Sequence, residues 1–350
     1  MATPQVTVAI NGNSVSNVQT MTLTKGRVKV SDNLRPGTAT VTGRRPDLLP
    51  ATEIGDSVDI TLSASGGIAS RTFSYRVADL TIDYGIVSSM DTWTLELEDA
   101  FAYLGRAVVT RSWTAGTAAS TVATNICSDV GITLAVNTTS LSTVSAQTVT
   151  NESALDVFQT LVNTEAALVQ AGSTNISWFS RGWQSSIVYY VFADDGSGDK
   201  YDTVTFGSLA DNYADKVVVT PRGGTEVATG TGIFSYNLDS YSFDTGQATQ
   251  LGLYTKGVFD VQTSTPQTMS VLFNLDTTLP VYELDALGVG AGITLVFRTG
   301  TYKSLVEGFT ITSDTTATRI TYNLSSTAFY AFLTLNDAVL GRLNYNKLGF

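Results

Sequence analysis

The sequence predicts a mainly β protein that contains two related β-barrel modules and a small α/β insert between them. Apolar residues alternate with polar ones over many short segments, the pattern of strands with one buried and one wet face. Thr, Ser, Val and Gly are abundant, and only 15% of the residues are charged, which suits exposed strand faces that carry hydroxyl groups. The third observation is an internal repeat.

The repeat joins two stretches that lie roughly 230 residues apart, far beyond the period of any solenoid. Ile-Thr-Leu, Thr-Ile and Ala-Phe occur at 60–62, 81–82 and 100–101, and they recur in the same order at 293–295, 310–311 and 328–329. We therefore predict two copies of one β module. The expected division is a first barrel over 1–108, the insert over 109–208, a second barrel over 209–330 and a tail over 331–350.

In the first module, period-two alternation predicts the strands. The expected inward side chains are Val6, Val8, Ile10, Val58, Ile60, Leu62, Trp93, Leu95 and Leu97. Between Phe73 and Tyr84 the apolar parity flips near Ala78-Asp79, which predicts a β-bulge or a corner. Asp99 is the expected N-cap of a short helix over 99–106, with Phe101 and Leu104 facing the barrel.

In the insert, helical spacing replaces alternation. Val122, Ile126 and Val130 predict one helix, and Ser153 is the expected cap of a second. The apolar stripe of that second helix is Leu155, Phe158, Leu161 and Val162. Strands are expected over 167–170, 176–179 and 187–192.

The second module is expected to begin with a strand over 216–220 and a return strand over 225–229. Residues 246–276 are ambiguous. A helix over 265–275 would place Met269, Leu272 and Phe273 inward. The strands that match the first module follow, and after them the tail.

Nucleophilic and metal chemistry finds little support. The chain has no histidine, so it can form neither a Ser-His-Asp or Cys-His system nor an HExxH zinc site. The lone Cys127 forms no intramolecular disulfide and lies among small and apolar neighbours, so we expect it to be buried. We predict no catalytic residue, no metal site and no cofactor.

Some patterns nevertheless have a functional interpretation beside a structural one. Residues 194–199 look like a calcium loop but lack its register, so a polar hairpin turn is favoured. Glu96 and Glu98 share a strand face, which suggests the paired carboxylates of a glycosidase, yet alternation alone places both outward. Trp178 and Trp183 suggest a sugar platform, although core packing is the default. The glycine-rich run at 288–292 precedes a strand, so it is a turn rather than a phosphate loop.

Charge restricts the choice of partners. The net charge is −11, and Arg44-Arg45 is the only adjacent basic pair. A nucleic-acid-binding groove needs clustered Lys and Arg, so none is expected. An acidic surface still suits a protein past which DNA slides. No apolar run approaches the about 20 residues of a membrane helix, and the N-terminus lacks a signal-peptide pattern, so we expect cytosolic synthesis without membrane insertion.

Segments spread over most of the chain carry a family resemblance. They are 37–47 with Ile54-Gly55, 80–84 with 93–98, 154–168, 213–225, and 335–341 with 346–350. In this order they resemble the tail hub, or minor tail protein, of long-tailed phages. That family is similar in plan to the trimeric baseplate hub of contractile-tailed phages.

The resemblance implies a homotrimer at the distal end of the tail in the virion, assembled in the host cytoplasm. Three subunits with two tube-like barrels each would form a six-lobed ring around the DNA channel. Such a ring could join a sixfold tube to a threefold tip. The implied partners are the distal tail ring protein, tail tip or fibre proteins and the tape-measure protein, with DNA passing without specific binding.

Two candidate surfaces follow from this resemblance. Glu96 and Glu98 are expected to line or neighbour the channel as part of an acidic wall that repels DNA. The tail is expected to pack on its own or a neighbouring subunit, through Asp337, Leu340, Leu348 and Phe350. The alternatives are a receptor-binding adhesin, which would bind host cells, and a tail-borne glycan depolymerase, which would cleave host glycan.

Overall fold

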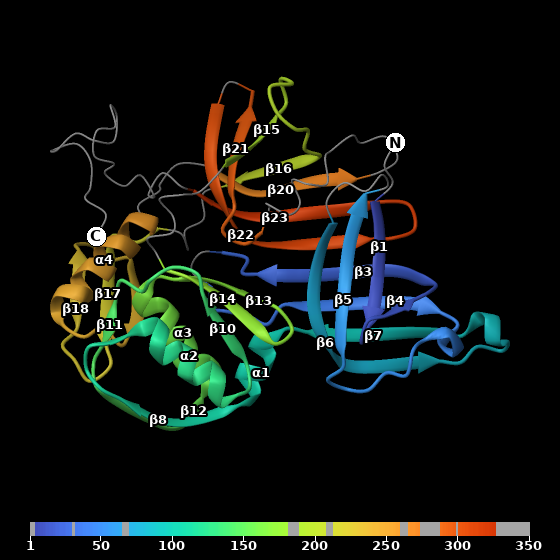
Figure 1. Cartoon of the computed structure of the whole chain (residues 1–350). Coiled ribbons are helices and arrows are strands. Elements are labelled where there is room, and N and C mark those ends of the chain that lie inside the picture. Colours follow the sequence, from blue (N-terminus) through green and yellow to red (C-terminus); the bar gives the residue numbers. More distant parts are fainter. Residues whose placement is uncertain are drawn as a thin grey trace.

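The computed structural model describes residues 4–29, 32–64, 70–180, 189–207, 213–259, 265–273, 288–298 and 300–326. One long sheet runs through the molecule and connects two β modules, while helices gather beside one end of it (Figure 1). The mainly β class that the sequence predicts is confirmed.

The N-terminal β module is an antiparallel sheet in the spatial order β2-β1-β5-β6-β7-β4-β3. Its strands are β1 (Pro4–Ile10), β2 (Asn13–Val15), β3 (Val18–Gly26), β4 (Thr38–Arg44), β5 (Ser57–Ala64), β6 (Ser70–Asp83) and β7 (Thr92–Glu98), with short 3-10 turns η1 (Pro46–Leu48) and η2 (Ser88–Met90). The alternation that the sequence shows is confirmed, because Ile10, Ile60 and Leu95 all lie in the core.

The parity flip in β6 is a β-bulge. The pairing of β6 with β7 shifts register between Val77 and Asp79, so Ala78 is the extra residue. The bulge returns apolar side chains to the core face, and Leu80 and Ile82 pack against that core. The strand then runs beyond the core, where Tyr84 is exposed.

The C-terminal β module repeats this topology. Its strands are β15 (Tyr189–Ala193), β16 (Thr203–Gly207), β20 (Thr265–Phe273), β21 (Gly292–Phe297), β22 (Gly300–Ser313) and β23 (Thr318–Ser326). Their order, β15-β21-β22-β23-β20-β16, corresponds strand by strand to β1-β5-β6-β7-β4-β3. The bulge recurs too, because the β22–β23 pairing shifts between Val306 and Gly308. One pairing differs: β15 lies parallel to β21, whereas β1 lies antiparallel to β5.

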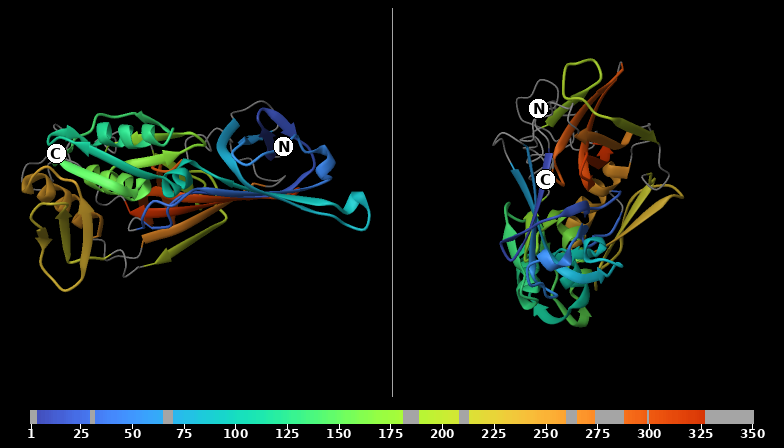
Figure 2. Two further views of the ribbon diagram at one scale, coloured as in Figure 1. Left: turned by 90° about the horizontal axis from the view of Figure 1, so that it is seen from below. Right: turned by 90° about the vertical axis from the view of Figure 1, so that its right-hand side faces the viewer.

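The two modules join edge to edge. Strand β3 of the first pairs antiparallel with β22 of the second, so one sheet continues from β16 to β6. In this joint Leu23 lies opposite Ile311, and Thr22 lies opposite Thr312. Each module curls on itself (Figure 2), but the strand pairings described here leave it an open curved sheet rather than the expected closed barrel.

The α/β insert packs around its own core. Its elements are α1 (Ala100–Arg106), β8 (Val108–Trp113), β9 (Thr117–Ala118), α2 (Ala119–Asp129), β10 (Thr133–Val136), β11 (Thr143–Val144), β12 (Gln147–Ser153), α3 (Ala154–Glu165), β13 (Leu168–Ala171) and β14 (Asn175–Phe179). Both predicted caps are confirmed: the Asp99 side chain accepts from the N–H of Phe101, and that of Ser153 accepts from Asp156. Phe101 and Leu104 are buried in the core of the insert, not against the β module as the sequence suggested.

A small α/β unit stands beside the insert, and it was not predicted. It contains β17 (Lys216–Pro221), β18 (Val227–Gly230), β19 (Ser235–Ser240) and α4 (Thr245–Phe259). Strand β17 pairs only with β18 and β19 in the described residues, and α4 covers this sheet. Residues 213–259 therefore do not belong to the second barrel.

The expected boundary at residue 208 is therefore wrong in both directions. Strands β15 and β16 precede it, yet they pair with β21 and β20 of the C-terminal module. The helix expected over 265–275 is strand β20, which buries Met269 and Val271 on one face. Hydrogen-bonding partners on both sides, β16 and β23, favour the strand over the helix.

Candidate functional site

The most extensive feature of the molecule is a hydroxyl-rich face of the continuous sheet, here called the polar face. Cross-strand partners share one side of a sheet, so the register identifies its members. In the N-terminal module they include Thr20, Thr22, Thr24, Thr38, Thr40, Thr42, Arg44, Arg76, Asp79, Thr81, Asp83, Thr92, Thr94, Glu96 and Glu98. In the C-terminal module they are Thr203, Thr205, Thr268, Ser270, Thr310, Thr312, Arg319, Thr321 and Asn323.

Hydroxyl groups on the polar face bind one another across the strands. The Oγ1 atoms of Thr20 and Thr42 are 2.6 Å apart, and those of Thr24 and Thr38 are 3.0 Å apart. In the second module, Thr203 and Ser270 hydroxyls make the bond that corresponds to Thr20–Thr42, also at 2.6 Å. Polar groups that satisfy each other in this way leave the face wet but offer few free donors to a passing ligand.

Two acidic side chains face each other on this surface. Asp79 on β6 lies directly opposite Glu96 on β7, and Glu96 is exposed as the sequence predicts. Like charges in directly opposed positions are unfavourable. Glu96 accepts a hydrogen bond from Thr40 Oγ1 at 2.8 Å. The corresponding pair in the second module is neutral, Gly308 opposite Asn323.

Carboxylates outnumber guanidinium groups along the polar face. Arg319 is held by Asp202 at 2.6 Å, at the edge near β16. Arg44 and Asp83 lie in one cross-strand row with Thr92 between them, and Asp83 is four residues along β6 from the Asp79 and Glu96 pair. The surface is therefore hydrated and weakly acidic.

Glu98 does not share the exposure of Glu96, and that part of the prediction is wrong. Its side chain is buried, and both carboxylate oxygens accept from Arg106, one of them at 2.5 Å. Alternation fails here because the strand ends at Glu98 and the chain turns into α1. Helix α1 brings Arg106 back over the carboxylate, which sequence parity cannot show.

A buried charge pair ties the N-terminal module to the insert. Lys25 Nζ lies 3.1 Å from Asp99 Oδ2, donates to the carbonyl of Ala171 at 2.8 Å and sits 4.0 Å from the centre of the Tyr75 ring. Burial lowers the pKa of Lys25 and raises that of Asp99, while the attraction between the two charges opposes both shifts. The sequence revealed Asp99 as a helix cap but gave no sign of Lys25.

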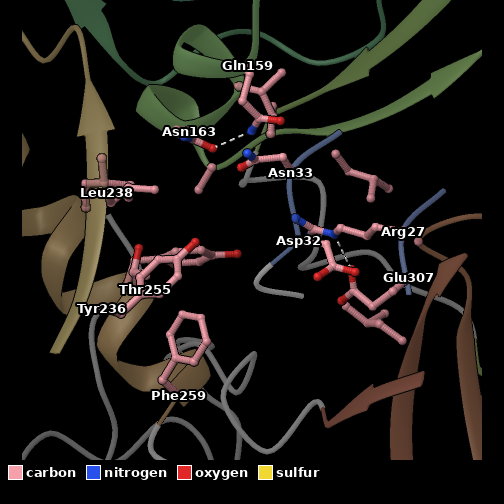
Figure 3. Close-up of a pocket in the computed structure, with 18 of the residues that line it drawn as sticks. Arg27, Asp32, Asn33, Gln159, Asn163, Tyr236, Leu238, Thr255, Phe259 and Glu307 are labelled. Atoms are coloured by element: carbon pink, nitrogen blue, oxygen red, sulfur yellow. Dashed lines mark hydrogen bonds and ion pairs between the residues drawn. The ribbon is translucent and has the colours of Figure 1, made fainter. Parts of the chain in front are cut away.

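A pocket of about 100 Å³ lies where the insert, the small α/β unit and the C-terminal module meet (Figure 3). Two of the charged groups in it are paired, because Arg27 donates to Glu307 at 2.7 Å, and a third, Asp32, accepts from the backbone N–H of Lys29 at 3.1 Å. Gln159 likewise donates to Asn163 at 2.7 Å. Glu307 is the bulge residue of β22, and Ser325 also donates to it. These contacts are typical of an interface between packed structural units rather than of a ligand-binding site.

The remaining candidates have structural roles. Cys127 is buried, and burial raises its pKa to about 12. Trp178 packs in the insert core against Phe158, whereas Trp183 lies outside the described residues. In the 194–199 segment, Asp195 accepts from the N–H of Ser197, as in a polar turn.

Within the described part of the chain, no group of three or more acidic, Cys or His side chains is placed to hold a metal ion. No helix among these residues is long and apolar enough to cross a bilayer. The expected contact residues of the tail also fall outside the described residues: Asp337, Leu340, Leu348 and Phe350.

Comparison with known proteins identifies the fold. No family model and no curated protein matches the sequence. Among solved structures, the 43 kDa tail protein of prophage MuSo2 from Shewanella oneidensis superposes with a TM-score of 0.65 at 11% identity, over 91% of this chain and 98% of that one. The chain has the fold of phage tail proteins.

Two further structures agree with this. A tail protein from Neisseria meningitidis gives a TM-score of 0.67 at 8% identity, covering 93% of this chain and 98% of its own. An E. coli type VI secretion component, described as similar to the phage T4 tail proteins gp27 and gp5, gives 0.58 at 9% identity over 92% and 77%. The resemblance drawn from the sequence is confirmed at the level of the fold.

Proposed function

We propose that this chain is a structural, non-catalytic component of a phage tail, a trimeric hub ring that surrounds the DNA channel. The observation that carries the proposal is the pair of like β modules joined edge to edge in one sheet. Three copies would then present six similar modules. Such a ring can meet a sixfold tube or distal tail ring on one side and a threefold tip on the other.

The two modules differ where a threefold partner would need them to differ. The hairpin between β6 and β7 is long and carries exposed Ile86 and Met90 at its end, whereas β22 and β23 are joined by a short polar turn at 314–317. A ring of three copies would alternate long and short hairpins. Sixfold symmetry would hold in the sheets and threefold symmetry at the tips.

The polar face is the proposed wall of the channel. An acidic, hydroxyl-lined surface repels phosphate groups and lacks the clustered cations that DNA binding needs. The like charges of Asp79 and Glu96 face each other at some cost in stability. In this proposal their function is to repel DNA. Glu98 has no part in it, since Arg106 neutralises it.

Several features of this proposal rest on the fold likeness. They are the location at the distal end of the tail in the virion and the contacts with a distal tail ring protein, tail tip or fibre proteins and a tape-measure protein. The tail segment with Asp337, Leu340, Leu348 and Phe350 remains the proposed contact with its own or a neighbouring subunit.

Native mass spectrometry of the purified protein tests the proposal, because each copy has a mass of 37.1 kDa. The expected species contains three copies, and negative-stain class averages should show a ring with a central hole. Six copies would instead indicate a tube-type or distal-tail ring. A monomer at all concentrations would refute the ring and leave the adhesin and depolymerase alternatives, to be tested by binding to host cells and by turnover of host glycan.

A further inference from the structure

We propose that neighbouring copies of this chain join by antiparallel pairing of β16 of one copy with residues 79–84 of the next, which are the end of β6 and the residue after it. The inference rests on the proposed ring and specifies its subunit contact. The internal joint between β3 and β22 provides the template. Because the modules are related strand by strand, the same joint can be formed again between chains.

The two edges that would pair lie on opposite sides of the sheet. Among the described residues, β16 is the last strand at one side of the sheet, and the second half of β6 forms an edge at the other, because β5 pairs only with the first half (Figure 1). The first half of β6 pairs with β5 up to Arg76, but in the described part of the chain Asp79–Asp83 has a strand partner only in β7. The corresponding half of β22, from Gly308 to Ser313, is covered by β3.

The module correspondence fixes the register. Glu96 and Asn323 are equivalent because each lies opposite the residue after the bulge. Their partners Thr40 and Thr268 are therefore equivalent, and the residues opposite these, Thr22 on β3 and Thr205 on β16, correspond as well. Strand β22 corresponds to β6 through the shared bulge, which makes Thr312 equivalent to Asp83 and Ile311 equivalent to Ile82. Transferring the internal pairs therefore places Thr205 opposite Asp83, and Phe206 opposite Ile82, of the next copy.

Side chains in the internal joint are more deeply buried than their equivalents at the two free edges. Leu23 and Ile311, opposed in the internal joint, are 0% and 2% exposed. Their equivalents Phe206 and Ile82 are only partly buried, although both pack against the same core. A strand paired along each edge would bury Phe206 and Ile82 more completely.

The β16 edge lacks the usual protection against pairing, whereas the β6 edge carries two charges, Asp79 and Asp83. Soluble proteins guard open sheet edges with Lys, Pro or inward charges. The β16 sequence Thr-Val-Thr-Phe-Gly contains none of these. On β6, apolar exposure increases beyond the sheet, with Tyr84 78% and Ile86 98% exposed. In the transferred register Tyr84 falls opposite Val204, so this exposed surface lies where a second copy would cover it.

Disulfide trapping tests the register directly. Asp83→Cys and Thr205→Cys in one chain place thiols opposite each other only across the proposed joint, at a Cα separation of about 5 Å, within disulfide reach. The native Cys127 is buried, so it stays out of the reaction. Mild oxidation with copper phenanthroline should convert most of the protein into covalently linked trimers on a non-reducing gel.

Matched variants control for geometry. Thr22→Cys with Thr312→Cys puts the same chemistry in the internal joint and should link within one chain, without any larger species. Asp83→Cys with Thr268→Cys moves one thiol a strand further away, about 10 Å from its partner, and should not link. Mixing the two single variants, Asp83→Cys and Thr205→Cys, should give covalent dimers and nothing larger.

The outcomes separate the contact from the ring. A trimer by native mass in which the internal pair links but the Asp83–Thr205 pair does not would overturn the strand pairing and leave the ring standing. Equal linking of the Thr268 control would overturn the register. A protein that stays monomeric by mass would overturn both.

Discussion

Removing one partner of the buried Lys25–Asp99 pair should destabilise the protein far more than removing both. The two side chains are 9% and 2% exposed, and their charged atoms are 3.1 Å apart. Asp99→Asn keeps the cap of α1, because Asn is as good an N-cap as Asp. It leaves the Lys25 charge buried beside the Ala171 carbonyl and the Tyr75 ring, with a second cation, Arg71, nearby.

Breaking a buried pair on one side typically costs about 3–5 kcal/mol, while replacing both partners is close to neutral. We expect Asp99→Asn to lower the free energy of unfolding by an amount in this range. Lys25→Met combined with Asp99→Asn should lie within about 1 kcal/mol of the wild-type protein, since neither a charge nor an empty site remains. Urea unfolding followed by far-UV circular dichroism measures each variant.

The pH dependence gives a second readout. Burial already lowers the pKa of Lys25 below 10.5, and loss of Asp99 lowers it further. Between the folded pKa and 10.5 the unfolded chain binds more protons than the folded one, so the stability of Asp99→Asn should rise with pH over that window. The double variant, which lacks Lys25, should not share this rise. A double variant as unstable as the sum of its single changes would refute the reasoning.

Three further predictions test the joint, the polar face and the core. Ile311→Ala should lower the free energy of unfolding by about 2–5 kcal/mol, because Ile311 is buried in the internal joint. Ile82→Ala should lower it by about 1 kcal/mol or less in the dissociated monomer, where Ile82 is only partly buried. Equal losses in urea unfolding at low protein concentration would contradict this difference in burial. Replacing Asp79 and Glu96 by Lys should make the protein retain DNA at low salt and release it at high salt, measured by fluorescence anisotropy; unchanged anisotropy would argue against the proposed wall. Because burial raises the pKa of Cys127 to about 12, its thiol should stay neutral and unreactive towards Ellman's reagent at pH 8 until urea unfolds the chain; immediate colour would show that the site is accessible.

Local patterns in the sequence determined much of the fold. Period-two alternation identified the strands around Ile60 and Leu95, and the parity flip located the bulge at Ala78. Asp99 and Ser153 marked two helix starts. Each of these features depends on residues close together in the chain, so it can be inferred without knowing what lies across the core. The repeat required only that two local patterns recur.

Helix α4 falls mostly in the stretch that the sequence left ambiguous, and it contains glycines, which are unfavourable in an isolated helix. A Cβ at Gly252 would lie 2.5 Å from Thr229 Oγ1, so the glycine allows α4 to approach β18 closely. That reason exists only once the two elements are packed together.

What the tertiary structure alone decided depends on partners distant in sequence. The apolar run at 265–273 fits either a helix or a strand, and its two neighbouring strands select the strand. Strand parity placed Glu98 outward, but the returning helix covered it with Arg106. The sequence by itself determined that a β module occurs twice, because that information is local. Only the tertiary structure decided how the copies join, because the β3–β22 pairing unites residues almost three hundred positions apart. Among the described residues it leaves two matching edges open.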